Sequence, residues 1–178
     1  MESPAHLVSY TAGNDPPSAA PHGLDEIIAA FGDIHAYVAA DGQLEARWQL
    51  GFLERIHLPF SLCLSWDQSR SITQMTCHRR LSGIFSLVFS RIQERELQGK
   101  ITSFGGCFAF RPQRTGRRLS SHSWGIAIDL NPESNEQGSV GNMDAAIIAI
   151  FRDAGFEWGG DWHGKSCDPM HFQFCTGY

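Results

Sequence analysis

The sequence lacks any apolar run that approaches the ~18 residues needed to cross a membrane. Its N-terminus also lacks a basic stretch followed by an apolar one, so a secretion signal is not expected. The net charge is −5, and there is no basic stripe of the kind that binds nucleic acid or anionic lipid. These absences predict a protein made in the cytoplasm, with no signal peptide, no membrane anchor and no nucleic-acid partner.

The five cysteines include no CxxC pair, and their odd number argues against a disulfide framework. We therefore expect free thiols in a reducing compartment. The 178 residues, with 42% hydrophobic and 19% charged side chains, are typical of one soluble domain. Residues 1–22 are rich in Pro, Ala, Ser and Gly, which predicts a flexible arm before a single domain over residues 23–178.

Hydrophobic periodicity predicts helices over residues 24–31, 74–96 and 143–154. The longest has an apolar stripe from Leu81 to Ile92 and is expected in the core. Strands are predicted over residues 61–66, 101–110, 125–130 and 168–174, the second broken at Gly105 and Gly106. This order predicts an α+β domain in which a small antiparallel sheet packs against helices.

The stretch SSHSWGIAIDLN, residues 120–131, places His122 seven residues before Asp129. On the strand over residues 125–130, Asp129 shares a face with Ala127 and Gly125, which predicts a carboxylate on the floor of a cleft. On one regular strand His122 and Asp129 would point apart. They can converge only if the chain turns at Ser123–Trp124, a turn that Gly125 favours.

The stretch DPMHFQF near the end of the chain adds Asp168 and His171. Two imidazoles and a carboxylate form a common catalytic zinc set, so His122, Asp129 and His171 are candidate ligands for one Zn²⁺ ion. Asp168 is then the candidate general base. The basic loop before His122 offers Arg111 or Arg114 to stabilise an oxyanion.

Each of these residues also has a simpler structural explanation. A histidine before a strand often only makes hydrogen bonds, an aspartate often caps a turn, and arginines often lie in solvated loops. Trp162 is a candidate for substrate contact, although tryptophans commonly serve in packing. A rival structural zinc site would consist of four residues spaced four apart: His163, Cys167, His171 and Cys175. Gly164 and Pro169 disfavour the helix that would align those four side chains.

The first motif resembles the SxHxxGxAxD pattern of the zinc D-alanyl-D-alanine peptidases, and WGGDW followed by DPMHF resembles that family's second motif. The family includes VanY-like carboxypeptidases, VanX-like dipeptidases and phage endolysins that cut L-alanyl-D-glutamate bonds. The resemblance extends through GCFAFRPQR, and more loosely to the FGD at residues 31–33 and the SWD at residues 65–67. It implies a hedgehog/D-Ala-D-Ala peptidase-like fold.

The resemblance also implies that His122, Asp129 and His171 bind zinc and that Asp168 is the base. Arg111 matches a substrate-positioning or oxyanion arginine, with Arg114 as its alternative. Ser120 or Ser121 matches the serine of the motif, and Ser120 has the SxH spacing and a supporting role. The implied substrate is the stem peptide of bacterial cell-wall peptidoglycan.

The endolysin-like subgroup fits the short chain best and implies cleavage of L-alanyl-D-glutamate. Such a monomeric enzyme would be made in a host cytoplasm, be released by a separate holin-type protein and act on the cell wall. The alternatives are a D-alanyl-D-alanine carboxypeptidase and a non-catalytic zinc-binding domain on the same scaffold.

Overall fold

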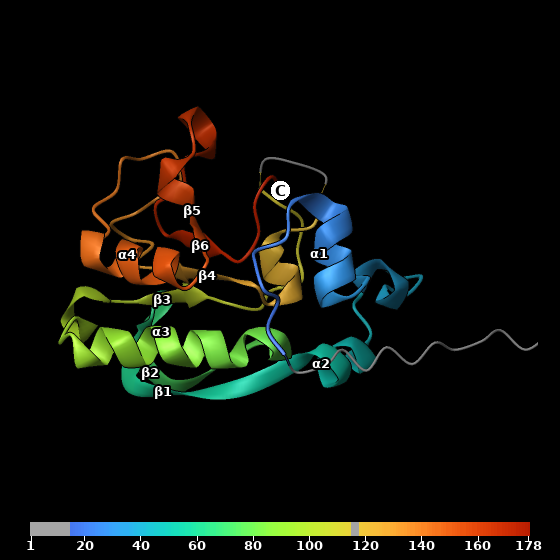
Figure 1. The fold of residues 1–178 in the computed structure, drawn as a ribbon, viewed down its shortest axis with the longest axis horizontal. Coiled ribbons are helices and arrows are strands. Elements are labelled where there is room, and N and C mark those ends of the chain that lie inside the picture. The colour runs from blue at the N-terminus through green and yellow to red at the C-terminus, as the bar shows by residue number, and fades with distance from the viewer. Residues whose placement is uncertain (1–14, 115–117) are drawn as a thin grey trace, which may run out of the picture.

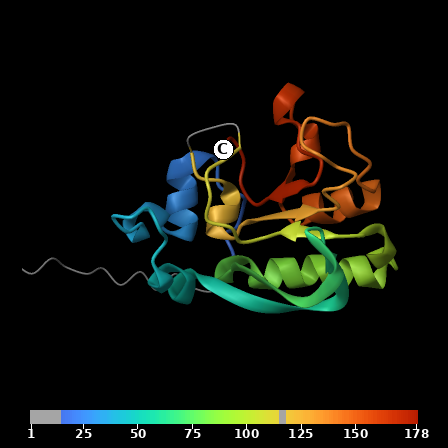
Figure 2. The ribbon, with the colours of Figure 1, turned by 180° about the vertical axis from the view of Figure 1, so that it is seen from behind.

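The computed structural model describes residues 15–114 and 118–178, and Figures 1 and 2 show it from opposite sides. Helices and strands are mixed along these residues, which confirms the predicted α+β class. The α-helices are α1 (Gly23–Phe31), α2 (Ala46–Phe52), α3 (Ser82–Glu94) and α4 (Ala145–Asp153). Among the described residues, none of these helices has the length and apolar character that a membrane crossing would need.

The strands form one sheet in the order β2-β1-β3-β4-β6-β5. They are β1 (Leu53–Leu64), β2 (Asp67–His78), β3 (Phe104–Gly106), β4 (Ala127–Leu130), β5 (Glu157–Trp158) and β6 (His171–Gln173). All neighbouring pairs are antiparallel except β1 and β3, which meet in parallel at Leu64 and Phe104. This order places β4 directly beside β6, so the two motif strands are neighbours.

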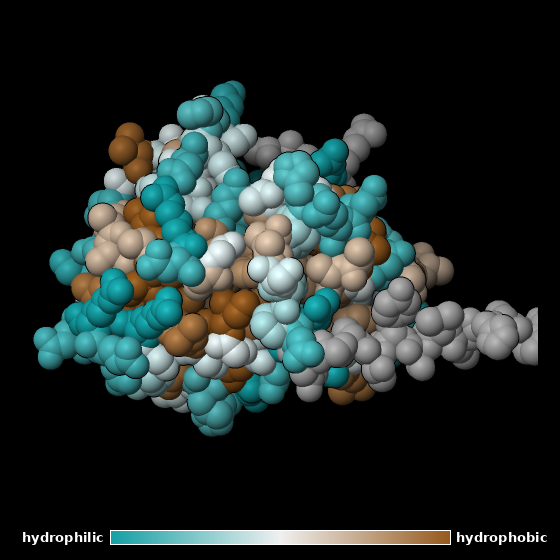
Figure 3. Space-filling view, in the orientation of Figure 1, coloured by the Kyte–Doolittle hydropathy of each residue, from teal (hydrophilic) through white to brown (hydrophobic). Residues whose placement is uncertain are grey.

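One face of the sheet is covered by α3, which packs on β1 and also contacts α4 (Figure 1). Phe151 of α4 stacks on Phe172 of β6, with ring centroids 4.2 Å apart. Phe85 of α3 meets Phe156 at 5.1 Å. Burial of each such ring contributes about 1.5–3 kcal/mol. On the outside, Figure 3 shows mostly hydrophilic residues with apolar ones interspersed. The core thus fixes β4 and β6 from behind and leaves their opposite face for the site.

The helix predicted over residues 74–96 is wrong in its first part. Residues 74–78 belong to β2, and α3 begins only at Ser82. Met75 and Cys77 are buried while Gln74 and Thr76 remain partly exposed, an alternation of period two that a strand satisfies. Pairing along β1 therefore overrides the helical reading. In α3 itself the predicted stripe is buried, with Phe85, Val88, Phe89 and Ile92 facing the core.

The helices predicted over residues 24–31 and 143–154 are confirmed as α1 and α4. The strand predicted over residues 61–66 is the end of the much longer β1. The other three predicted strands are shorter than expected, because β3, β4 and β6 pair over only three or four residues each. Short α2 and the strand β2 were not predicted.

The end of the predicted arm and the start of the predicted domain are both tied to the C-terminal segment. The Thr176 N–H donates to the Pro21 carbonyl at 2.9 Å, and the Gly23 N–H donates to the Thr176 carbonyl at 2.8 Å. These bonds place α1 beside the C-terminal segment, as Figure 1 shows. Residues 1–14 of the predicted arm lie outside the described residues.

Candidate metal centre

The pairing of β4 with β6 brings Asp129 and His171 together. The two residues are direct partners in the antiparallel register, a position that places side chains on the same face. Gly105 and Gly106 of β3 lie on the other side of Asp129. A Cβ atom on Gly105 would stand 2.8 Å from the Cβ of Asp129. Any larger residue at position 105 would therefore displace the Asp129 side chain. The glycine pair in this strand is therefore part of the site's construction.

His122 reaches the same point from a turn. Residues Ser121–Trp124 form a single 3₁₀ turn, and the Ser120 hydroxyl caps it by accepting from the His122 N–H. Gly125 ends the turn at φ 70°, a left-handed conformation, and its N–H donates to the His122 carbonyl at 2.9 Å. The turn predicted between His122 and Asp129 is thus confirmed, and it aims the imidazole back over β4.

Three donor atoms converge at this point. Asp129 Oδ1 lies 3.1 Å from His122 Nε2 and 2.9 Å from His171 Nδ1. The two imidazole nitrogens are 3.2 Å apart. All three residues are buried, with exposures between 3% and 7%. Among the described residues, this is the only group of three or more His, Cys, Asp or Glu side chains close enough to share a metal ion.

The outer contacts decide which nitrogens carry protons. His122 Nδ1 lies 2.7 Å from the Cys107 carbonyl, which can only accept, so Nδ1 carries the proton and Nε2 presents a lone pair. His171 Nε2 lies 3.1 Å from Gln173 Oε1. The Gln173 amide nitrogen donates to Glu157 Oε2 at 3.0 Å, which turns Oε1 toward His171. His171 Nε2 therefore carries the proton, and Nδ1 presents a lone pair to Asp129.

This arrangement fits a cation. Two imidazole lone pairs and a carboxylate oxygen face one another with no proton between them, which is repulsive unless a positive charge lies at their centre. Donors bound to a tetrahedral zinc ion at its usual distances lie ~3.3 Å apart, and the three separations here are 2.9–3.2 Å. Without a cation, burial opposes ionisation of Asp129, but the two histidines, once protonated, outweigh it and hold its pKa below the usual range.

Asp168 stands next to this cluster, in a contrasting environment. Burial raises its pKa to about 6, even though His171 acts in the opposite direction. Its Oδ1 is buried and has no hydrogen-bond partner among the described residues. The Asp168 N–H donates to the Gly159 carbonyl at 2.8 Å, and a Cβ on Gly159 would meet the Asp168 carbonyl at 2.5 Å. The first glycine of WGGDW thus allows the backbone contact that positions Asp168.

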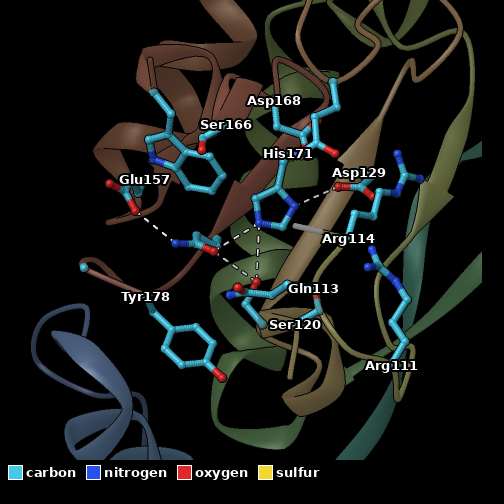
Figure 4. Close-up of a pocket in the computed structure, with 15 residues that line it drawn as sticks. Arg111, Gln113, Arg114, Ser120, Asp129, Glu157, Ser166, Asp168, His171 and Tyr178 are labelled. Atoms are coloured by element: carbon cyan, nitrogen blue, oxygen red, sulfur yellow. Dashed lines mark hydrogen bonds and ion pairs between the residues drawn. The ribbon is translucent and has the colours of Figure 1, made fainter. Parts of the chain in front are cut away.

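A pocket of about 440 Å³ opens over the cluster (Figure 4). Its lining includes every predicted site residue except His122, which lies beneath the floor. Trp162 forms one wall, with its ring 5.5 Å from the His171 ring, and Ser120 lies at the base of the same pocket. The residues that the sequence analysis missed are Gln113, Gln137, Glu157, Ser166, Gln173, Gly177 and Tyr178. Gln173 could have been found, because it shares a strand face with His171.

Both candidate arginines line this pocket, but their environments differ. The charge of Arg114 acts on Asp168 and lowers its pKa against the larger effect of burial. The backbone of Arg111 is fixed, since its N–H donates to the Ser123 hydroxyl at 3.1 Å. Figure 4 shows both guanidinium groups on the Asp129 side of the pocket. Arg114 is therefore coupled to the candidate base, and Arg111 is anchored to the turn that carries His122.

The rival set of cysteines and histidines does not converge. His163 is exposed and Cys175 is buried, while the Cys167 thiol faces the Ser139 carbonyl at 3.3 Å. His171 points instead to Asp129. Burial raises the pKa of the Cys175 thiol above its ordinary value, which disfavours the thiolate that zinc binds.

Residues 113–174 match the family model described as D-alanyl-D-alanine carboxypeptidase. The match confirms, over these residues, the resemblance to the VanY-like zinc peptidases. It supports a metallopeptidase, and peptidases of this family depend on zinc. The matched segment contains His122, Asp129, Asp168 and His171, whereas the looser resemblance in residues 24–112 lies before it. No solved structure matches the chain significantly.

Proposed function

Because residues 113–174 match a zinc peptidase family, we propose that this protein is a zinc-dependent peptidase of bacterial peptidoglycan. His122, Asp129 and His171 would hold one Zn²⁺ ion, and Asp168 would be the general base. The observation that carries this proposal is the convergence of three unprotonated donor atoms beneath a pocket that also contains a carboxylate with an unpartnered oxygen. A purely structural hydrogen-bond cluster would not need that second carboxylate.

When bound here, zinc would lower the pKa of a water molecule in the pocket to roughly 7. Asp168 accepts the proton that this water loses as its oxygen attacks the scissile carbonyl carbon. Asp168 then gives that proton to the nitrogen as the carbon–nitrogen bond breaks, which releases a neutral amine.

Arg111 is proposed to stabilise the oxygen that becomes negative during the attack, since its backbone is held against the turn of His122. Arg114 is the alternative, and its effect on Asp168 gives it a second proposed role in tuning the base. Ser120 supports the site by capping the turn. Trp162 is proposed to pack against the substrate, because its ring forms a wall beside His171.

The proposed bond is L-alanyl-D-glutamate, as in the endolysin-like subgroup that the two motifs resemble. D-glutamate joined through its side chain keeps a free carboxylate beside the scissile nitrogen, and the arginines of this pocket could bind it. The second candidate is a D-alanyl-D-alanine carboxypeptidase, which the description of the matched family favours. Its substrate also presents a carboxylate next to the scissile nitrogen, so the arginines suit both.

If the protein is an endolysin, as proposed, it is a monomer made in the host cytoplasm. It is then released by a holin-type protein and acts on the cell wall. Co-expression with and without such a membrane-lesion protein tests this: lysis only in its presence is expected. Lysis without it would contradict this role.

Digestion of purified sacculi by the zinc-loaded protein, followed by mass spectrometry, tests the reaction itself. New L-alanine C-termini and D-glutamate N-termini are expected. Release of free D-alanine alone would indicate the carboxypeptidase instead. If the zinc-loaded protein cleaves no stem peptide, and Asp168→Asn behaves identically, a non-catalytic zinc-binding domain would replace both.

A further inference from the structure

A second cavity, of about 680 Å³, lies on the hairpin formed by β1 and β2. Residues 70–76 of β2 and Arg55 of β1 line it, together with Trp66 at the tip of the hairpin. Phe104 and residues 106–108 close its other side. We call this cavity the hairpin pocket. Its volume lies within the range typical of ligand sites, roughly 300–1,000 Å³.

The hairpin pocket shares a wall with the metal centre. Gly106 lines the hairpin pocket and pairs across β3 and β4 with Asp129. Cys107 also lines it, and its carbonyl is the group that fixes His122. A ligand in the hairpin pocket would therefore lie against the backbone that supports the candidate metal ligands.

Both pockets open on the same face of the sheet. Arg55 and Thr76 are cross-strand partners that line the hairpin pocket, whereas Ile56, the neighbour of Arg55 on β1, is buried in the core on the side that faces α3. The strand order β2-β1-β3-β4 places the hairpin next to β3, which pairs with the strand of Asp129. A long substrate could thus extend across the sheet from one pocket to the other.

The hairpin pocket is positively charged in an acidic protein. Arg55 and Arg70 are the only charged residues in its lining, and the chain as a whole has a net charge of −5. Neither arginine forms an ion pair or side-chain hydrogen bond within residues 15–114 and 118–178. Arg111 and Arg114 come shortly after Phe108 in the chain and line the metal pocket. Guanidinium groups therefore occur in both cavities.

An aromatic surface accompanies this charge. Trp66 is 64% exposed, and its ring lies 6.4 Å from that of Phe104. Phe108 adds a partly exposed ring to the same lining. Exposed tryptophan beside unpaired arginines is a combination enriched where proteins bind partners.

We propose that the hairpin pocket binds a carboxylate-bearing stretch of peptide that extends from the substrate in the metal pocket. This inference rests on the proposed function, since the stem peptides of peptidoglycan carry several free carboxylates and continue beyond the scissile bond. Arg55 and Arg70 bind carboxylates through their paired N–H groups, and Trp66 packs on the aliphatic part of the peptide. The site would select long substrates over short ones.

Steady-state kinetics of the zinc-loaded protein on two substrates test the proposal. One is a short acyl-dipeptide confined to the metal pocket, and the other is a cross-linked muropeptide. For Arg55→Gln/Arg70→Gln we expect KM for the muropeptide to rise roughly tenfold with kcat unchanged. The short substrate should be unaffected. The matched control, Arg91→Gln/Arg95→Gln, removes the same charge near the C-terminal end of α3, across the sheet, and should change neither.

A binding measurement keeps the outcome independent of catalysis. The zinc form of Asp168→Asn is titrated with a fluorescent stem peptide and with the same peptide after amidation of every carboxylate except the one beside the scissile nitrogen. Weaker binding of the amidated peptide is expected, with the difference abolished by Arg55→Gln/Arg70→Gln. Equal binding of the two peptides would overturn the proposal even if hydrolysis is normal. Displacement of the peptide by inorganic phosphate at lower concentration than by acetate would assign the pocket to a phosphate-bearing ligand instead.

Discussion

Gln173 Oε1 lies 3.1 Å from Nε2 of His171, and the same amide is held in that orientation by Glu157. The hydroxyl of Ser121 completes the arrangement by donating to Gln173 Oε1 at 3.0 Å. A chain of hydrogen bonds therefore runs from β5 through β6 to the candidate metal ligand. Such outer contacts fix the tautomer and orientation of a ligating imidazole.

Replacing Gln173 should weaken metal binding. Gln173→Leu removes the amide acceptor of the His171 Nε2–H and leaves only the Ser121 hydroxyl, at 3.3 Å, so the ring is held less firmly and we expect zinc affinity to fall by about 10–100-fold. Competition with a chromophoric chelator measures this directly. Gln137→Leu is the matched control, because Gln137 lines the same pocket but makes no side-chain hydrogen bond to the three candidate ligands. Equal zinc affinities of the two variants would show that the hydrogen bond between Gln173 and His171 does not support metal binding.

Replacing Asp168 should separate catalysis from metal binding. Asp168→Asn keeps the shape of the side chain but removes the base, so kcat/KM should fall by about 10²–10⁴-fold. Zinc content should remain one ion per chain, because Asp168 is not among the three converging donors. Elemental analysis of the purified variant, beside peptide hydrolysis, provides both readings. Loss of zinc together with activity would make Asp168 a ligand.

The same substitution should stabilise the metal-free protein at neutral pH. Burial raises the pKa of Asp168 from 3.8 to about 6, so the folded state binds this proton more tightly than the unfolded state. The resulting stabilisation is complete below pH ~4 and is lost as pH rises through about 6. Such a shift corresponds to at most ~3 kcal/mol, which partial exposure reduces to roughly 1–2 kcal/mol.

Asp168→Asn imitates the protonated carboxyl at every pH. In urea unfolding without metal, the variant should exceed the wild type in stability at pH 7.5 and equal it near pH 4. A difference that does not vary between these pH values would show that burial of the charge is not the cause.

The two arginines should be distinguishable by their pH profiles. Arg114 lowers the pKa of Asp168, so Arg114→Gln should move the acid limb of kcat/KM to higher pH. Arg111→Gln should instead lower kcat by about 10²–10³-fold without moving the limb, because its proposed partner is the oxyanion. The pH dependence of kcat/KM for both variants, on one short substrate, decides between these roles. If the effects are exchanged, so are the assignments.

Gly105 should tolerate no larger side chain. The Cβ of Gly105→Ala would meet the Asp129 Cβ at 2.8 Å, so we expect a loss of about 1–3 kcal/mol in unfolding free energy and weaker zinc binding. Gly83→Ala in α3 is the control, because its Cβ would meet nothing within 4 Å. That substitution should stabilise the helix by roughly 0.5–1 kcal/mol. Chemical denaturation of both variants tests the difference.

The sequence predicted which residues converge at the candidate site better than it predicted the sheet. His122, Asp129, Asp168 and His171 belong to two short motifs whose residue types and alternation carry chemical information by themselves. Residues 74–78 carry less information. The alternation of Met75 and Cys77 fits a strand, but the run is too short to outweigh the strong helical stripe that follows it, and pairing with β1 decides. Tertiary contact, which a single sequence does not display, fixed that segment.

Other features required the arrangement in space. The separation of His122 and Asp129 demanded a turn, and the sequence supplied Gly125 for it. That the Cys107 carbonyl would fix the tautomer of His122 could not be read from any pattern, because every residue has a carbonyl group. The same holds for Arg111 and Arg114, which both line the pocket and differ only in what their charges and backbones contact.

The turn that carries His122 depends on chain that precedes the family match. The Gly125 carbonyl accepts from the His78 N–H at 2.8 Å, and His122 is oriented by the Cys107 carbonyl. Both partners lie outside residues 113–174. The segment that matches the family therefore does not contain everything that builds the site. An excised fragment of residues 113–174 would keep every candidate ligand but lose both of these contacts, and we expect it not to assemble the centre. Relatives could diverge widely in their first half, provided that some backbone there continues to offer one N–H and one carbonyl at these two points.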